Sequence, residues 1–282
     1  MTLLAIPNVS EGRDRTAIDA IANAFDGRLL DVHFDTDHHR SVFTLAGEPG
    51  ELVHSVANGA TEAIRQVDLN AHRGIHPRVG AIDVAPIVYL DPADRGAACA
   101  EALVLGDLLG EELELPVFLY GELAQGRTRA ELRKGGPDTL AKRIEAGELK
   151  PDFGPHQLHP TAGAVLVAAR PPLVAFNVEL APPATLEDAR SIAARIREGG
   201  PEGLESVRAI GLWLAARDVP QVSTNVEDHR ATPLANVVEA IARHATPSQA
   251  ELVGLAPRAA FDGFPDDLPV ANRRLVEDAL AE

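Results

Sequence analysis

Cysteine is nearly absent from the sequence, and its scarcity excludes two common ways of stabilising a fold. The 282 residues include a single cysteine, Cys99. One thiol cannot form an internal disulfide framework or supply a multi-cysteine metal site. We interpret Cys99 as a small core residue on a helix. We therefore expect the chain to work in a reducing, cytoplasmic location.

Long apolar runs are also missing. No segment approaches the roughly 18 consecutive apolar residues that indicate a membrane-spanning helix. The first residues, 1–6, carry no basic flank and are followed by Pro7 and Asn8. We interpret them as a first strand and not as a signal peptide, and we expect no membrane partner.

Positive charge is the third scarce feature. Lysine and arginine total 26 residues against 42 aspartate and glutamate residues, which gives a formal net charge of −16. An acidic surface repels nucleic acids and anionic lipids, so we expect neither as a partner. It also repels small anions. An anionic substrate would therefore require a local group of arginines close to glycine-rich turns.

Several motifs of known chemistry are absent as well. The chain has no Walker or dinucleotide-binding glycine fingerprint, no Gly-x-Ser-x-Gly segment and no zinc signature. His72 and His76 are four residues apart, a spacing that suits a metal on a helix. Gly74 and Pro77 disfavour a helix there, and no carboxylate lies at the usual offset. We therefore predict no metal site.

The apolar residues that are present follow a pattern typical of two sheet-and-helix units. The first unit is expected to have the order βαββαβ, continued by a helix and two strands, over residues 3–6, 13–25, 29–34, 41–46, 51–67, 81–89, 95–112, 117–120 and 164–169. The second is expected to repeat that order over residues 173–180, 186–197, 207–214, 219–225, a helix opening at 232–233, and 251–255. We also expect a terminal helix within 264–282. The pattern predicts an α+β fold with subdomains 1–172 and 173–282.

The segment 72–80 is the strongest indication of chemistry. It combines two histidines, two arginines and two glycines between a predicted helix and a predicted strand. Histidine accepts and returns protons near neutral pH, and the arginine fork matches carboxylates. His76 precedes Pro77, which biases its backbone toward an extended conformation. The alternative is a capped helix end with solvated basic residues.

Other polar segments are weaker indications. In the predicted turn at 35–40 we interpret Asp35 and Asp37 as ordinary charged-turn residues and keep Arg40 as a candidate, because it adjoins an apolar strand. The helix N-terminus near 6–13 would favour an anion, although capping by Ser10 or Asp14 is the simpler interpretation. Further candidate segments are 120–122, 132–136 and 221–225.

Together these segments resemble the formiminotransferase domain of glutamate formimidoyltransferase, which in animals is part of formiminotransferase-cyclodeaminase. The matching pieces occur in family order: IPNVSEGR (6–13), HHRSVFTLAG (38–47), HPRVGAIDVAP (76–86), FLYGE (118–122), LRKGG (132–136), PDFGP (151–155), VAFNVEL (174–180), AIGLWL (209–214), QVSTN (221–225) and ELVGLAP (251–257). The resemblance implies two ferredoxin-like βαββαβ subdomains whose sheets face a central cleft or tunnel.

The resemblance also implies which residues form the site. It places the proton-transferring histidine at His76. It places folate binding on ten consecutive residues: Gly154, Pro155, His156, Gln157, Leu158, His159, Pro160, Thr161, Ala162 and Gly163. His33 stands where the animal enzymes have an aspartate, so Asp31, Asp35 or Asp37 would have to replace it. We hypothesise that Arg40, Arg73 and Arg78 hold glutamate carboxylates.

The implied activity is transfer of the formimino group of N-formimino-L-glutamate to N5 of tetrahydrofolate, a co-substrate. The resemblance further implies a homodimer, and the cyclodeaminase half is missing, so a separate enzyme would deaminate the product. Three alternatives stay open. They are formyl transfer from 5-formyltetrahydrofolate to glutamate, non-catalytic folate binding, and metal-dependent hydrolysis by the histidine pairs.

Overall fold

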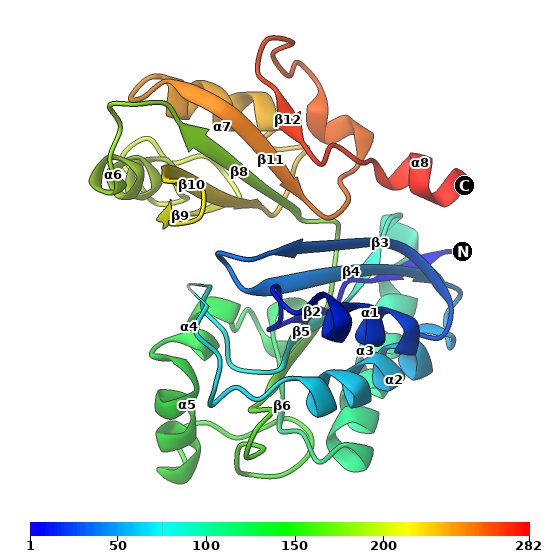
Figure 1. The fold of residues 1–282 in the computed structure, drawn as a ribbon. Coiled ribbons are helices and arrows are strands. Elements are labelled where there is room, and N and C mark those ends of the chain that lie inside the picture. Colours follow the sequence, from blue (N-terminus) through cyan, green and yellow to red (C-terminus); the bar gives the residue numbers. More distant parts are fainter. Residues whose placement is uncertain (75) are drawn as a thin grey trace. The chain divides into compact units, whose positions relative to one another are not determined.

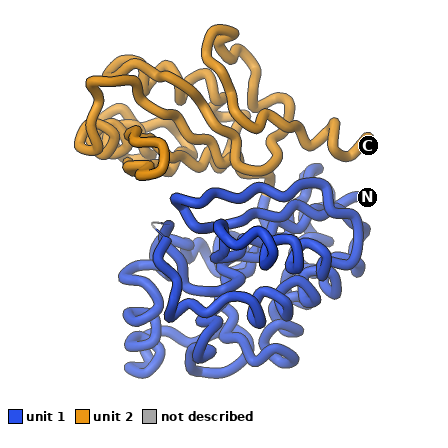
Figure 2. Tube along the Cα trace, viewed as in Figure 1, with its two compact units in different colours: residues 1–170 blue, residues 171–282 orange. Residues whose placement is uncertain are grey.

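A computed structural model describes residues 1–74 and 76–282; Ile75, within the predicted segment 72–80, lies outside them. The chain divides into two compact units, Met1–Arg170 and Pro171–Glu282 (Figure 2). Each unit has its own β-sheet, its own helices and its own apolar core. The predicted α+β class is therefore confirmed.

The first unit follows the predicted alternation and adds short elements to it (Figure 1). Its strands are β1 (Leu3–Ala5), β2 (Asn8–Val9), β3 (Arg28–Asp35), β4 (Arg40–Gly47), β5 (Ile82–Tyr89), β6 (Val117–Leu119) and β7 (Val165–Arg170). Its helices are α1 (Arg15–Ala24), α2 (Leu52–Gln66), α3 (Arg95–Glu112), α4 (Arg129–Arg133) and α5 (Gly136–Glu145), with single 3₁₀ turns at Pro92–Asp94 and Gly121–Ala124.

The sheet of the first unit is a ferredoxin-like core with a parallel extension. Strands β1 and β2 both lie between β4 and β5, β3 pairs with the other edge of β4, and all of these pairs are antiparallel. This arrangement is the strand order of a βαββαβ unit. Strand β7 then pairs in parallel with β5, and β6 pairs in parallel with β7.

Apolar clusters lie on both faces of this sheet, and the second one includes residues of α4 and α5. Apolar side chains of α1, α2 and α3 pack against one face in a single core. The guanidinium of Arg15 on α1 lies over the Phe34 ring, 4.9 Å from its centroid, so Phe34 points to the helix side. Successive side chains of a strand alternate between faces. Asp31, His33 and Asp35 of β3 therefore point to the opposite face.

The second unit repeats the antiparallel core. Its elements are β8 (Val174–Leu180), α6 (Leu186–Ile196), β9 (Val207–Leu214), β10 (Val219–Val226), α7 (Leu234–Ala242), β11 (Pro247–Val253), the 3₁₀ turn Arg258–Phe261, β12 (Val270–Ala271) and α8 (Val276–Ala281). The strand order is β12-β11-β8-β10-β9. Helix α6 begins with the predicted capping box of Thr185 and Asp188.

The terminal helix expected within 264–282 is present but occupies only the end of that segment. Only Val276–Ala281 is helical there, and Val270–Ala271 forms a strand that pairs in parallel with β11. Pro265 and Pro269 lie inside the predicted helix and cannot donate its backbone hydrogen bonds.

Among the described residues, no helix combines the length and the apolar character that crossing a bilayer requires.

Close packing between α3 and a loop leads to a stability prediction. A Cβ on Gly110 would lie 2.7 Å from the amide nitrogen of Gly154 and 3.0 Å from Cβ of Phe153. Because the clash involves backbone, we expect Gly110→Ala to lower the free energy of unfolding by about 1–3 kcal/mol. Urea unfolding followed by circular dichroism measures this change.

Gly96 on the same helix is the matched control. A Cβ there meets nothing within 4 Å, so Gly96→Ala should leave the free energy of unfolding unchanged or raise it by up to about 1 kcal/mol. Equal stability of the two variants would contradict the packing argument.

Candidate functional site

The loop that carries His76 runs from α2 to β5 and is fixed at both ends to the predicted folate segment. Near the start of the loop, the Leu69 amide donates to the Thr161 carbonyl oxygen at 2.9 Å. At its end, the Ala81 amide donates to the Ala162 carbonyl oxygen at 2.8 Å, and Gly80 forms a β-bridge with Gly163. The structure therefore brings residues 161–163 of the predicted folate segment against the His76 loop.

The segment 6–13 packs against the β3–β4 hairpin. Gly12, in the matched motif at 6–13, lies against the ends of β3 and β4, where a Cβ would be 2.3 Å from the Asp35 carbonyl oxygen. Its amide donates to Nδ1 of His39 at 3.1 Å. Asp14 caps α1 by accepting from the amides of Thr16 and Ala17, so capping explains the helix start.

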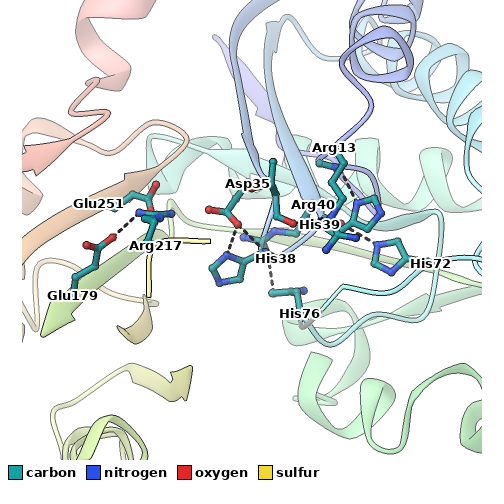
Figure 3. Close-up of polar contacts among 12 residues, drawn as sticks. Arg13, Asp35, His38, His39, Arg40, His72, His76, Glu179, Arg217 and Glu251 are labelled. Atoms are coloured by element: carbon teal, nitrogen blue, oxygen red, sulfur yellow. Dashed lines mark hydrogen bonds and ion pairs between the residues drawn. The ribbon is translucent and has the colours of Figure 1, made fainter. Parts of the chain in front are cut away.

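His76 is held against an arginine. Arg40 Nη1 lies 2.8 Å from His76 Nε2 (Figure 3). A guanidinium only donates, so Nε2 accepts, and we assign the hydrogen of the neutral ring to Nδ1. Burial, and then repulsion by Arg40, Arg133, His38 and Arg129, holds the pKa of His76 well below 6.5. The imidazole is therefore neutral at pH 7, in the form that can accept a proton.

Positive charge gathers around this imidazole. Burial and the neighbouring Arg133 lower the pKa of Arg40 to about 10, with a smaller contribution from Arg129, so Arg40 is still a cation at neutral pH. Arg133 donates to the carboxylate of Asp83, which is 1% exposed and also accepts from the Val79 amide at 2.7 Å. A group of three guanidiniums on an otherwise acidic protein favours a small ligand with carboxylates.

Helix α4 supplies two of these arginines. A capping box formed by Thr128 and Glu131 starts the helix, and Arg129 and Arg133 follow one turn apart. Arg129 also lies over the Tyr120 ring, 5.7 Å from its centroid. The sequence indicated a cationic segment at 132–136 but not Arg129 or Asp83. The capping pattern with arginines four apart would have placed both arginines on one helix face.

A second imidazole lies beside His76. Asp35 Oδ1 accepts from the backbone amide of His38 at 2.7 Å and is 2.9 Å from its ring Nδ1. The ring centroids of His38 and His76 are 6.3 Å apart, with the planes tilted by 58°. Asp35 therefore has a specific histidine partner, which its interpretation as an ordinary turn residue missed.

The other histidines of this region maintain the loop structure. The rings of His39 and His72 stack at 4.2 Å. His72 Nδ1 accepts from the Gly74 amide at 3.1 Å, and Nε2, 3.0 Å from the His39 carbonyl oxygen, is then the donor. Burial lowers the pKa of His72 to about 4, so the ring is neutral. The described residues contain no group of three or more His, Cys, Asp or Glu side chains placed to share a metal ion.

The remaining predicted residues occupy defined positions. Arg78 donates to the carbonyl oxygens of Gly74 and His72, each at 3.1 Å, and Arg73 Nη1 donates to that of His72 at 2.9 Å. Both guanidiniums thus support the loop, and their contact with carboxylates stays a prediction. Burial, and then Arg40, lowers the pKa of His33 to about 4, which leaves a neutral ring where a family aspartate was expected.

The predicted folate segment is a structured loop. His159 and Gly163 form an antiparallel bridge, and Nδ1 of His159 accepts from the amides of Thr161 and Ala162 at 3.3 and 3.0 Å. Gly154 and Gly163 have φ angles of +77° and +70°, which favour glycine. The contact of segment 154–163 with folate stays a prediction.

In the second unit, the sheet face opposite the helices carries polar side chains. Gln221 pairs with Glu179 across β10 and β8 and is fully buried, and within the part of the chain that the structure describes neither of its amide atoms has a hydrogen-bond partner. Arg217 donates to Glu179 at 2.5 Å and to Glu251 at 3.5 Å. This group overlaps the segment 221–225 indicated by the sequence.

Comparison with known proteins gives the family. Residues 2–170 match the formiminotransferase domain, N-terminal subdomain, and residues 175–262 match the formiminotransferase domain. Formimidoyltransferase-cyclodeaminase of Sus scrofa is 38% identical over 271 residues, which cover 89% of this chain and 49% of the relative. Glutamate formimidoyltransferase of Thermoplasma acidophilum is 36% identical over 270 residues, 91% of this chain and 88% of the relative.

A bacterial relative matches over a similar length. Glutamate formimidoyltransferase of Streptococcus pyogenes serotype M1 is 35% identical over 268 residues, covering 91% of this chain and 89% of the relative. The chain thus spans about half the length of the animal relatives and nearly nine tenths of these two prokaryotic ones.

The buried neutral His72 gives a pH-dependent stability prediction. Its pKa is about 4 in the folded chain against 6.5 for an ordinary histidine, so between these values only the unfolded chain binds the proton. The contribution of the neutral His72 ring to the free energy of unfolding is therefore complete above pH 6.5 and is lost as the pH falls toward 4. Urea unfolding from pH 7 to pH 4 should show a smaller decline for His72→Gln than for the wild type.

His54→Gln, on the exposed face of α2, is the control and should follow the wild-type curve. Parallel curves for the wild type and His72→Gln would show that this imidazole does not contribute.

Proposed function

Because the chain belongs to the formiminotransferase domain family, we propose that it transfers the formimino group of N-formimino-L-glutamate to N5 of tetrahydrofolate. One observation carries the proposal. A neutral imidazole, that of His76, lies 2.8 Å from Nη1 of Arg40, and the loop that carries His76 is hydrogen-bonded to the predicted folate segment. This arrangement supports acid–base chemistry on a substrate that carries carboxylates.

The reaction needs positioning and proton transfer. Folate N5 bonds to the formimino carbon, the bond from that carbon to the glutamate nitrogen breaks, and the N5 proton ends on the glutamate nitrogen. Holding two reactants together contributes up to about 7–11 kcal/mol. A well-placed acid–base group contributes roughly 10²–10⁴-fold in rate. We assign the acceptance of the N5 proton to His76.

Arg40 links substrate binding to this step. Its guanidinium occupies the Nε2 lone pair of His76, so the ring accepts a proton there only after Arg40 turns away. A substrate carboxylate attracts the guanidinium and frees the lone pair. We propose Arg40, with Arg129 and Arg133 behind it, as the main binder of carboxylates. Arg73 and Arg78 remain candidates for the same role.

Further proposals rest on the family resemblance. Folate contacts residues 154–163, and the chain forms a homodimer in the cytoplasm. The hydrogen bonds between residues 161–163 and the His76 loop support the folate assignment, because they place the two predicted parts of the site side by side.

The catalytic assignment predicts a specific defect. His76→Ala should lower kcat by at least about a hundredfold, because it removes the proton acceptor, while the Kd for tetrahydrofolate changes little. An absorbance assay with tetrahydrofolate and formiminoglutamate measures kcat. A parallel assay with 5-formyltetrahydrofolate and glutamate tests the formyl alternative. Wild-type turnover by His76→Ala would refute the assignment.

The binding assignment predicts a different defect. Arg40→Met should raise the KM for formiminoglutamate about tenfold or more, because a hydrogen bond to a charged group contributes about 1.5–3 kcal/mol. Steady-state kinetics with varied formiminoglutamate measures this. Arg65→Met, on the exposed end of α2, serves as the control. An unchanged KM in Arg40→Met would remove Arg40 from the substrate contacts.

A further inference from the structure

We infer that His38, held by Asp35, is a second proton-transfer residue of the site around His76. This inference rests on the proposed transferase function. The reaction takes a proton from one nitrogen and places a proton on another. Two adjacent imidazoles in different surroundings can serve as base and acid in the same turnover.

The geometry of His38 is that of an oriented acid–base group. Asp35 Oδ1 is 2.9 Å from ring Nδ1, and the same oxygen accepts from the His38 backbone amide at 2.7 Å (Figure 3). The carboxylate therefore fixes both the position of the ring and the hydrogen on Nδ1. Within the described residues, Nε2 of His38 has no hydrogen bond, so it is available to carry the transferred proton.

Different side chains face the two imidazoles. Arg40, Arg133 and Arg129 repel a proton from His76. His38 has a carboxylate oxygen of Asp35 against its ring, 2.9 Å from Nδ1. Asp35 lies against the His38 ring, and His38 is among the groups whose charge lowers the pKa of His33, on β3, and of His76, in the adjacent loop. His76 is thus suited to be the base and His38 the acid.

Three other imidazoles lie nearby. Within the described residues, His33 Nε2 is buried without a hydrogen-bond partner, and no carboxylate forms an ion pair with its ring. His72 uses both ring nitrogens in contacts with main-chain atoms, and its ring is stacked on that of His39. Nδ1 of His39 accepts from the Gly12 amide. Nδ1 of His39 also lies 3.3 Å from a carboxylate oxygen, that of Glu11, but its ring stacks on that of His72. Of these histidines, His38 is the one that combines a carboxylate partner with a position beside His76.

The proton steps balance as follows. As the bond from N5 to the formimino carbon forms, His76 takes the N5 proton. As the bond from that carbon to the glutamate nitrogen breaks, protonated His38 gives a proton from Nε2 to the glutamate nitrogen. The proton on His76 then returns to His38, so both rings are restored. Asp35 does not touch substrate and is a positioning residue.

The test compares three variants with the wild type in the formiminoglutamate assay from pH 5 to pH 9. His38→Gln keeps polarity but cannot transfer a proton, so kcat should fall roughly 10²–10⁴-fold with both KM values unchanged. The decline of kcat at high pH, which reports loss of the acid, should disappear. Asp35→Asn should lower kcat less and move that decline to lower pH. His54→Gln, on the exposed face of α2, should match the wild type.

The outcomes separate the inference from the proposed function. Wild-type kcat and an unchanged pH profile in His38→Gln would overturn the inference, even where His76→Ala is inactive. If the wild type turns over neither formiminoglutamate nor 5-formyltetrahydrofolate, both fall. If circular dichroism shows His38→Gln to be unfolded, Asp35→Asn decides. A lower kcat of Asp35→Asn with a shifted pH profile upholds His38 as a second proton-transfer residue. An unshifted pH profile overturns that inference.

Discussion

The contact between Arg40 and His76 is the interaction on which the rest of the site depends. A guanidinium held 2.8 Å from an imidazole nitrogen forces that nitrogen to accept, and so sets where the ring carries its hydrogen. Burial, and then this cation with Arg133, His38 and Arg129, lowers the pKa of His76 and keeps the imidazole neutral. These charges are costly to hold together, and Asp83 and Asp35 offset part of the repulsion. An anionic substrate would offset the remainder.

This contact exists because two distant segments are fixed to each other. Arg40 begins β4, and His76 lies in the loop before β5, 36 residues later. At the end of the His76 loop, Gly80 lets the backbone pass close to that of Ala164, because a Cβ there would lie 1.8 Å from the Ala164 carbonyl oxygen. The β-bridge between Gly80 and Gly163 then joins the loop to the predicted folate segment. The glycines of the matched motifs therefore have a geometric purpose that a lone motif does not reveal.

The sequence predicted the long elements well and the site only in part. Helix Arg95–Glu112 and strand Val207–Leu214 have the predicted bounds, because their apolar patterns are regular. Helices α4 and α5 were both missed. For α4, and with it Arg129, the reason is that five residues give too little periodicity to identify a helix. The pairing of Asp35 with His38 was missed for another reason. Composition cannot distinguish a solvated turn carboxylate from one that orients a ring.

The hairpin of β3 and β4 carries a consequence for how this family member can change. Asp35 and Arg40 are directly opposite each other in the strand register, and the turn between them holds His38. Side chains alternate strictly along a strand. A single inserted or deleted residue that shifted this register would therefore turn Arg40 to the face covered by α1, α2 and α3. Lineages that vary this turn must therefore alter its length without shifting the register, or give up the chemistry that it carries.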